Sequence, residues 1–473
     1  MITIGSLILL ICIGKICNQK NLYSIYRSLF ALTIIVELLI ERGFFIQIGS
    51  IQIAYRTICE ILLCVISIIL IVRSGGGVKR KISILTMLFV LVVVVGLIML
   101  CIFPTGAVGA TMEVSWDEIL VSKIPKQKIV FGSGMYTEII QLFLYVVIIV
   151  TAVSKLSKND FMIILEKVIK CSKYLLCLNC IEIFTKYIFH SNVYIDILNK
   201  LLGVSYSTVN TLDQRGRGFV LSGGTKEASH FAFSLFILFI LVFAYYTKNK
   251  QKSYDYMFFS IIFLNFILTM SFSTVYYGLC ALLTIWAYCF EKKGYSQIKF
   301  ISFFILFILG ISFAIYYLPL ISTLIGNNGF WGRRISSVLE EISLLNNEMW
   351  LKASTALEWS NRVRLGSTYE TFKLIKYRPL FGLGFSAVSA HSSLAMLFSG
   401  VGIIGTILCV EVIFSWCKRI INLNMELYYT FIFIFLFSLI LNSLSLRPFY
   451  EMWNILLGYS FALLSSRGEK NNV

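Results

Sequence analysis

Apolar segments of about 17–25 residues recur from one end of this chain to the other. A helix needs about 20 apolar residues to cross a hydrocarbon core of about 30 Å, so each segment is long enough to span a bilayer. The segments do not alternate and are about twice too long for tilted barrel strands, which excludes strands as the main element. The sequence therefore predicts an all-α polytopic membrane protein with about 12–14 transmembrane helices. The predicted spans cover about 2–16, 25–41, 51–72, 82–102, 134–153, 172–190, 229–246, 256–273, 275–290, 299–320, 393–415, 427–444 and 450–465.

The composition of the chain and the absence of linker segments agree with this class. Of the 473 residues 58% are hydrophobic and 14% are charged, whereas a soluble domain has about 25% charged residues. The first 13 residues are apolar at once, without a basic stretch or a small-residue cleavage site, so no cleavable signal peptide is expected. The 12 cysteines avoid the long polar segments, which argues against a disulfide scaffold. No Pro-rich or Gly-rich linker divides the chain, and we expect a single membrane domain over residues 1–473.

The distribution of positive charge predicts an orientation. A net charge of +17 suggests nucleic acid at first, yet 22 of the 41 Lys and Arg lie in short connections and the tail. All of these share one side if the amino terminus is outside, as the positive-inside rule requires. Another 12 belong to two long polar segments, 191–227 and 321–392, and long loops escape that rule. We therefore expect no nucleic-acid partner, and residues 321–392 are predicted to form a large extracytoplasmic loop inserted between spans.

That large loop is amphipathic and basic, with eight basic residues against five acids. Apolar residues at helical spacing predict one helix near 335–345 and a second after Asn361, with Leu365, Tyr369 and Phe372 on one stripe. Arg364 would then lie in the first turn of the second helix, where the helix dipole disfavours a cation. An arginine in that place hints at a function.

Three groups of residues outside the membrane could carry chemistry. The glycines let backbone amides approach a ligand, and the arginines offer planar forks suited to phosphate oxygens. As isolated patterns these glycine runs are weak, since small residues in a membrane helix usually serve packing. The groups are Arg-Gly-Arg-Gly-Phe at 215–219 with Ser-Gly-Gly-Thr-Lys-Glu-Ala-Ser-His at 222–230; Asn-Arg-Val-Arg at 361–364; and Arg-Pro-Leu-Phe-Gly-Leu-Gly at 378–384 with His391-Ser392 and the glycine-rich helix at 400–405.

The order of these groups resembles the O-antigen polymerase and O-antigen ligase superfamily of bacterial envelope enzymes, over residues 210–410. The resemblance implies a lipid-diphosphate glycan as donor and a reaction outside the cytoplasmic membrane, without metal or other cofactor. Carried over by position, Arg217 matches the arginine before the family's Glu-Pro-Ser segment, Arg364 the arginine of the large loop, and His391 the histidine after Pro-Leu-x-Gly-x-Gly.

The chain departs from the family pattern at two places. It has Glu227-Ala228 where the family often has Glu-Pro, and His391-Ser392 where the family often has His-Asn. The first puts the local turn in doubt, and the second leaves open what orients the imidazole. Arg215 and Arg362 are close enough in sequence to be the true equivalents instead of Arg217 and Arg364. Besides the three matched residues, the candidate substrate-binding residues are Arg215, Arg362, Arg378 and His230.

The chemistry of glycan transfer fits these residues independently. Negative charge develops on the departing diphosphate, and one well-placed donor is commonly worth about 3 kcal/mol of transition-state stabilisation. The acceptor sugar hydroxyl needs a proton acceptor, for which His391 is the first candidate and Glu227 the reserve. Asp196 and Asp213 stand alone in the outer segments, so no metal site is expected.

The sequence thus favours a membrane glycosyltransferase that polymerises undecaprenyl-diphosphate-linked oligosaccharide repeat units into O-antigen or capsular polysaccharide. We place it in the bacterial cytoplasmic membrane with the active site outside, beside a flippase and a chain-length regulator. A ligase that moves finished glycan to lipid A core shares the donor chemistry and stays an alternative. A flippase for lipid-linked oligosaccharide is a third, although the chain lacks visible internal repeats and carries a long outer loop.

Ionisable residues inside spans are costly and therefore candidates for function. The acids are Glu37, Glu60, Glu182 and Glu411. Pairing with Arg56 or with a neighbouring span is the simpler explanation for them. All three histidines, His190, His230 and His391, fall at predicted outer ends of spans, which is a mild hint of function. Contact with neighbouring groups is an equal alternative for His190 and His230.

Overall fold

We describe the chain from a computed structural model. The residues that the structure describes are 3–41, 43–48, 51–73, 80–111, 113–121, 124–191, 193–203, 221, 223, 228–248, 253–269, 272–293, 366–420, 425–441 and 453–465. The predicted span 299–320 and the predicted helix at 335–345 lie outside them.

The described residues are mostly helical, and six helices are long and apolar enough to cross a membrane. This confirms the all-α polytopic class. The predicted spans that fall on described residues coincide with helices to within a few residues, except that α7 begins earlier and one strand replaces the start of a span. The helices are α1 (Ile4–Cys17), α2 (Leu22–Leu39), α3 (Tyr55–Arg73), α4 (Arg80–Ile102), α5 (Trp116–Val121), α6 (Ser133–Lys155), α7 (Lys158–Ile183), α8 (Val193–Leu202), α9 (Ala228–Lys248), α10 (Ser253–Leu268), α11 (Phe272–Lys293), α16 (Ser393–Ile420), α17 (Met425–Leu441) and α18 (Trp453–Ser465), with a π-helix η1 (Phe184–Ile188) and a 3-10 helix η3 (Leu374–Tyr377).

Two short antiparallel ribbons accompany the helices. Strand β2 (Ile51–Ala54) occupies the predicted start of the third span and pairs with β1 (Phe44–Ile48). Its Ile-Gln-Ile sequence alternates with period two, which fits a strand better than a helix. A second ribbon pairs β3 (Val108–Gly109) with β4 (Gln127–Lys128).

Helix α7 begins at Lys158, about fourteen residues before the predicted span. The Ser157 side chain accepts from the amide of Asp160, and the Asp160 carboxylate accepts from the Ser157 amide. This reciprocal cap satisfies two amides that a helix start leaves without partners. The predicted connection between the spans 134–153 and 172–190 is therefore mostly helix.

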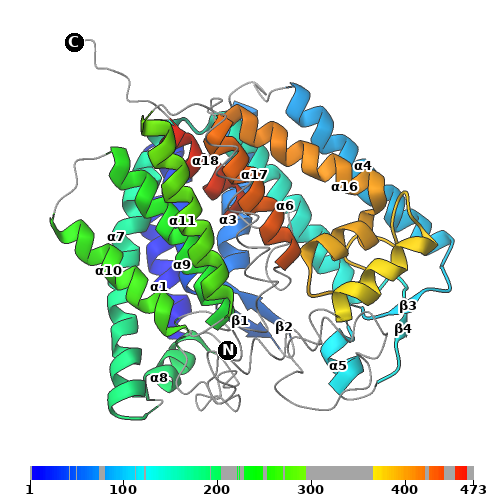
Figure 1. Cartoon of the computed structure of the whole chain (residues 1–473), viewed down its shortest axis with the longest axis horizontal. Helices are drawn as coiled ribbons and strands as arrows, with labels where there is room; N and C mark the ends of the chain where they lie inside the picture. Colours follow the sequence, from blue (N-terminus) through cyan, green and yellow to red (C-terminus); the bar gives the residue numbers. More distant parts are fainter. Residues whose placement is uncertain are drawn as a thin grey trace.

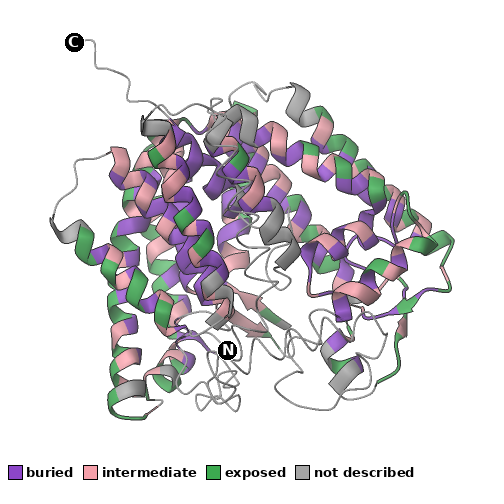
Figure 2. Cartoon of the chain, viewed as in Figure 1, coloured by how far each residue is buried: buried purple, intermediate pink, exposed green. Residues whose placement is uncertain are grey.

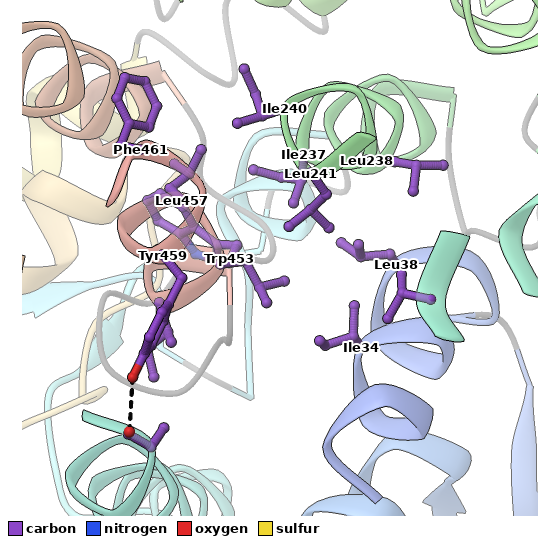
Figure 3. Packing of buried hydrophobic residues seen from close by; sticks show 14 of the residues in the cluster. Ile34, Leu38, Ile237, Leu238, Ile240, Leu241, Trp453, Leu457, Tyr459 and Phe461 are labelled. Carbon is purple, nitrogen blue, oxygen red and sulfur yellow. Dashed lines mark hydrogen bonds between the residues drawn. The ribbon is translucent and has the colours of Figure 1, made fainter. Parts of the chain in front are cut away.

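The helices pack as neighbours in three groups. Helix α2 lies against α3 and α7, α9 lies against α18 and α11, and α16 runs along α4 (Figure 1). Figure 3 shows Ile34 and Leu38 of α2 facing Ile237 and Leu241 of α9, with Trp453 and Leu457 of α18 completing the same core. The hydroxyl of Tyr459 donates to the carbonyl of Ala152, which ties α18 to α6 at 2.9 Å.

The outward faces of the helices are apolar as well. Ile8 of α1 is 57% exposed and Met87 of α4 is 71% exposed, and Figure 2 shows exposed positions along the outer helices. A soluble protein rarely leaves such continuous apolar surface in water. These faces are suited to lipid, which agrees with the length of the helices.

Candidate functional site

Helix α16 is broken at Gly402, where the backbone adopts φ 68° and ψ −170°. A break leaves amides and carbonyls without their helical partners, and this costs several kcal/mol per group in lipid. Here the glycine segment, residues 379–384, supplies the missing partners on both sides of the break. The bonds run from Ile403 N to Pro379 O (2.8 Å), from Ile404 N to Leu380 O (3.2 Å), from Leu383 N to Ser399 O (2.7 Å) and from Gly384 N to Gly400 O (3.0 Å).

The glycines of this pairing are required by the closeness of the two backbones. Gly382 (φ 73°) and Gly402 have positive φ, and a Cβ at either position would collide with a carbonyl of the facing segment. On α4, a Cβ at Gly96 would lie 3.0 Å from the carbonyl oxygen of Phe381. The two glycine-rich patterns of the sequence are therefore one structure, a backbone lattice between the glycine segment and α16.

The chain around this lattice, residues 366–392, is packed on the connection between α4 and α6. Leu374, Leu383 and Val388 share a small core with Leu100 and Met135. Three polar contacts hold the same segment. They are Trp116 Nε1 to Thr371 Oγ1 (3.3 Å), Ser389 N to Ala110 O (3.2 Å) and Lys126 Nζ to Glu370 Oε2 (2.8 Å).

His391 is held by a hydroxyl. Its Nδ1 lies 3.1 Å from the Oγ of Ser367, and its backbone amide donates to the same oxygen at 3.2 Å. Ser367 is fully buried in the first turn of the helix over residues 366–373. The neighbouring Ser392 instead caps α16, since its Oγ accepts from the amide of Ala395. Among the described residues, Ser367 contacts the imidazole and helps to orient it, and sequence reasoning missed this residue.

Arg378, directly before the glycine segment, is half-buried. Its Nη1 is buried and has no hydrogen-bond partner among the described residues. Burial also lowers the pKa of Arg378. A guanidinium nitrogen in this condition is suited to an anionic oxygen.

His230, at the start of α9, is held by a carboxylate. Its Nδ1 lies 2.9 Å and 3.0 Å from the two oxygens of Glu41, which follows the end of α2. The side chains of His230 and Glu41 keep 12% and 17% exposure. The pair therefore stands at the edge of the helical core and is partly open.

A chain of polar side chains continues from this pair between α2, α3 and α6. Arg56 Nε lies 3.2 Å from Glu60 Oε1, and Glu60 is fully buried. The hydroxyl of Tyr145 lies 3.2 Å from the same Glu60 oxygen and 3.4 Å from Glu37 Oε2. Glu60 thus pairs with Arg56, which is one of the two simpler explanations that the sequence offered for the acids inside spans. Of the other acids inside spans, Glu411 is exposed and accepts from Ser415 at 3.3 Å.

A small cavity of about 30 Å³ joins this chain to the His230–Glu41 pair. Its volume can hold one or two water-sized groups. Residues from four helices and their ends form its wall, and all but Leu38 are polar or aromatic. They are Glu37, Leu38, Glu41, Arg56, His230, Phe233, Ser234 and Trp453.

Gly223, within the first of the three residue groups, is held by a buried acid. The amide of Gly223 donates to Glu182 Oε2 at 3.1 Å, and Leu221 N donates to Leu268 O at 3.0 Å. Glu182, on α7, is fully buried and thus serves this connection. Five predicted site residues lie outside the described residues, namely Arg215, Arg217, Glu227, Arg362 and Arg364.

The two described histidine sites differ in surroundings, since His391 lies on Ser367 and His230 on Glu41. Within the described part of the chain, no group of three or more His, Cys, Asp or Glu is arranged to hold a metal ion. The described helices are those of a membrane protein, and they hold two candidate polar sites, one at His391 and one at His230. No family model, curated protein or solved structure matches the chain.

Sequence reasoning named His230 but not its partner. Glu41 lies 189 positions away in the chain, just past the apolar run that became α2. A signal was present, because Glu37 and Glu41 are spaced by four and would share a helix face at a span end. Ser367 offered no comparable signal, since a serine in a polar loop is ordinary.

Proposed function

We propose that the chain is a membrane glycosyltransferase that polymerises lipid-diphosphate-linked oligosaccharide repeat units on the outer face of the bacterial cytoplasmic membrane. The proposal includes 12–14 membrane spans, an amino terminus outside and the large outer loop at 321–392. It rests on the order of the three residue groups and on the chemistry that their arginines and histidines offer.

The observation that supports it most is the backbone lattice of the third group. Arg378 immediately precedes the glycine segment and His391 follows it by seven residues, so both are attached to one rigid piece of backbone. A buried guanidinium nitrogen without a partner among the described residues suits a diphosphate oxygen. An imidazole oriented by Ser367 suits a reacting hydroxyl.

In the proposed reaction, arginines bind the diphosphate of the donor lipid and stabilise the charge that it gains on leaving. Arg217 and Arg364 are assigned this role, with Arg215, Arg362 and Arg378 as further contacts. The acceptor is the terminal sugar hydroxyl of an incoming repeat unit. An imidazole takes its proton, and the resemblance assigns this step to His391, with Glu227 in reserve.

The test is a reconstituted reaction. Cells that lack the protein should accumulate single lipid-linked repeat units, and the purified full chain should convert these into polymer. Alanine at Arg217, Arg364 and His391 should each abolish the polymer, while Glu411→Gln, at an exposed membrane position, should retain it. Polymer made by all three alanine variants would contradict the site. Movement of the units across vesicles without a new glycosidic bond would contradict the enzyme, and loss of attachment alone in cells would replace polymerisation with ligation.

A further inference from the structure

The chain directly before the glycine segment presents a surface of mixed character. Phe372, Tyr377 and Leu380 keep 37%, 43% and 53% exposure, and Lys376 among them is exposed as well. We call these four residues the mixed surface. A surface made for water rarely gathers large apolar side chains, and one made for hydrocarbon excludes lysine. Aromatic and aliphatic residues combined with lysine are typical of segments that lie at the boundary between lipid and water.

The opposite side of the same segment is fixed to the protein. Ser367 and Thr371 are fully buried, and Leu374 of η3 is 6% exposed. The segment is therefore amphipathic, with one face already packed and the other left for a partner. Because the inner face is held in the core, the outward direction of the mixed surface is a fixed feature of the fold.

The depth of this segment follows from the residues that Leu374 contacts. It shares a core with Leu100, in the last turn of α4, and with Met135, in the first turn of α6. Both helices are long and apolar enough to span a membrane. Lipid headgroups begin where such helices end, so the segment lies at headgroup level. In Figure 1 the yellow chain before α16 lies beside the end of α4 and the β3–β4 ribbon.

Further aromatic rings are exposed at the same helix ends. Phe103, directly after α4, is 65% exposed, and Tyr136, in the first turn of α6, is 59% exposed. The ring of Tyr136 meets that of Phe131 edge-on, with centroids 4.9 Å apart. Aromatic side chains gathered at one depth are typical of the region where membrane helices enter the headgroups.

Positive charge is concentrated beside the mixed surface. Glu370 lies 2.8 Å from Lys126 and 3.4 Å from Lys373, so two lysines share one carboxylate. The ammonium of Lys376 lies 5.3 Å from the centroid of the Tyr377 ring, which holds it over the aromatic face. Lysines at headgroup level attract anionic lipids, whose phosphates carry the opposite charge.

We infer that the mixed surface binds the lipid bilayer, with Lys376 on the phosphate of an anionic phospholipid and the three apolar side chains among the upper acyl chains. The segment that the sequence assigned to a large outer loop is thereby attached to the membrane surface. Arg378, one residue beyond Tyr377, is then at the level of lipid phosphates. The inference concerns phospholipid and does not depend on the proposed function.

The experiment uses the full chain with the photocrosslinking residue p-benzoylphenylalanine at position 377. The protein is reconstituted in nanodiscs of equal parts phosphatidylglycerol and phosphatidylcholine and irradiated, and mass spectrometry identifies the adducts. We expect lipid adducts in which phosphatidylglycerol exceeds phosphatidylcholine by about twofold or more. Lys376→Gln should bring the two lipids to equal shares. Lys170→Gln, which removes an exposed lysine of α7, is the matched control and should leave the shares unchanged.

Two further positions calibrate the adducts. The same photocrosslinking residue at Glu118, exposed on the short helix α5, should give no lipid adduct. At Leu91, 56% exposed in the middle of α4, it should give adducts with both lipids in equal shares. Should the variant at 377 fail to fold, position 380 takes its place.

The outcomes that overturn the inference are distinct. Adducts at 377 with another segment of this chain or with a second copy would show that protein covers the mixed surface. The absence of any adduct would show that it faces water. Equal shares of the two lipids in the unaltered background, or enrichment that survives Lys376→Gln, would overturn the contact between lysine and phosphate. Polymer formation does not enter this readout, so failure of the proposed function would leave the inference standing.

Discussion

The surroundings of His391 and of His230 are built by opposite means. His391 follows a lattice of main-chain hydrogen bonds between the glycine segment and the broken helix α16, and a hydroxyl holds its ring. His230 lies beside charged side chains from α2 and α3, and a carboxylate holds its ring. The first arrangement depends on the absence of side chains, and the second depends on their charge.

Because of this difference, the two sites should tolerate different kinds of substitution. Backbone contacts at hydrogen-bond distance leave no room for a Cβ, so the lattice is sensitive to volume and indifferent to charge. The charged side chains of Glu41, His230, Arg56 and Glu60 depend on charge more than on volume. Removing one of these charges leaves the opposite charge less well compensated in a low dielectric. Mutations of matched size should therefore affect the two sites differently.

The largest effect should come from adding a methyl group to the lattice. Gly402→Ala and Gly382→Ala each combine positive φ with a collision against a backbone carbonyl, so we expect a loss of about 4 kcal/mol or failure to fold. Chemical unfolding in mixed micelles measures this. Gly14→Ala is the control, because a Cβ there meets nothing within 4 Å and alanine favours the helix by about 0.5–1 kcal/mol.

Removing the buried carboxylate of Glu60 should have the next largest effect. Glu60→Ala removes the carboxylate that Arg56 contacts and one of the two acceptors near the Tyr145 hydroxyl, and we expect a loss of about 2 kcal/mol in the free energy of unfolding. Glu411→Ala, at an exposed membrane position, should stay within about 0.5 kcal/mol. Equal losses from the two variants would break the comparison, since the charged chain would then contribute nothing particular.

A smaller effect should follow from Ser367→Ala. The variant deprives the His391 amide of its acceptor and the imidazole of its hydroxyl contact, which costs about 1 kcal/mol. Ser260→Ala removes an exposed hydroxyl that bonds only the Tyr256 carbonyl and should change little. The unfolding assay measures both. A change of several kcal/mol would show that His391 depends on side chains as strongly as His230 does.

The smallest effect is a pH dependence at Asp160, a carboxylate that belongs to neither histidine site. Burial would raise the pKa of Asp160, but hydrogen bonds from Ser157 and Tyr23 and the charge of Arg27 together lower it. The pKa is thus lower in the folded chain than the ordinary value of about 3.9 in the unfolded chain. Stability from this group is present above about pH 5 and is lost as pH falls through the lowered folded pKa.

The check is the unfolding midpoint measured between pH 3 and pH 7. Asp160→Asn should remove part of the loss of stability on the acid side and leave a lower, flatter profile above it. An unaltered acid slope in the variant would mean that other carboxylates, including those beside His230, dominate the titration.

Most of the helical architecture could be predicted from the sequence because hydrocarbon thickness alone sets the length of an apolar run. The predicted 229–246 became α9 and the predicted 82–102 became α4 with small changes of boundary. The errors occurred where local signals competed. The first turns of α7 contain polar residues, so the apolar pattern placed its start too late, whereas the Ser157 cap marks the true start. Residues Ile51–Ala54 were assigned to a span because they adjoin its apolar run, although their alternation is typical of a strand.

The candidate sites were less predictable, for physical reasons. The hydrogen bonds between the glycine segment and α16 use main-chain atoms, which every residue has, so the glycines are the only sequence signal of this contact. Their close approach explains why both patterns carry glycine. The contact of His230 with Glu41 joins positions 189 apart, and no local period encodes such a distance. The predictions for Arg217 and Arg364 lie outside the described residues and stay predictions.

The break in α16 also has a consequence for biogenesis. Translation delivers the glycine segment about twenty residues ahead of Gly402, so partners for Ile403 and Ile404 exist before those amides emerge. Without that segment, the two amides and the carbonyls of Ser399 and Gly400 would enter hydrocarbon bare. Helix α16 therefore needs the glycine segment in place before its broken turn can lie in a lipid environment.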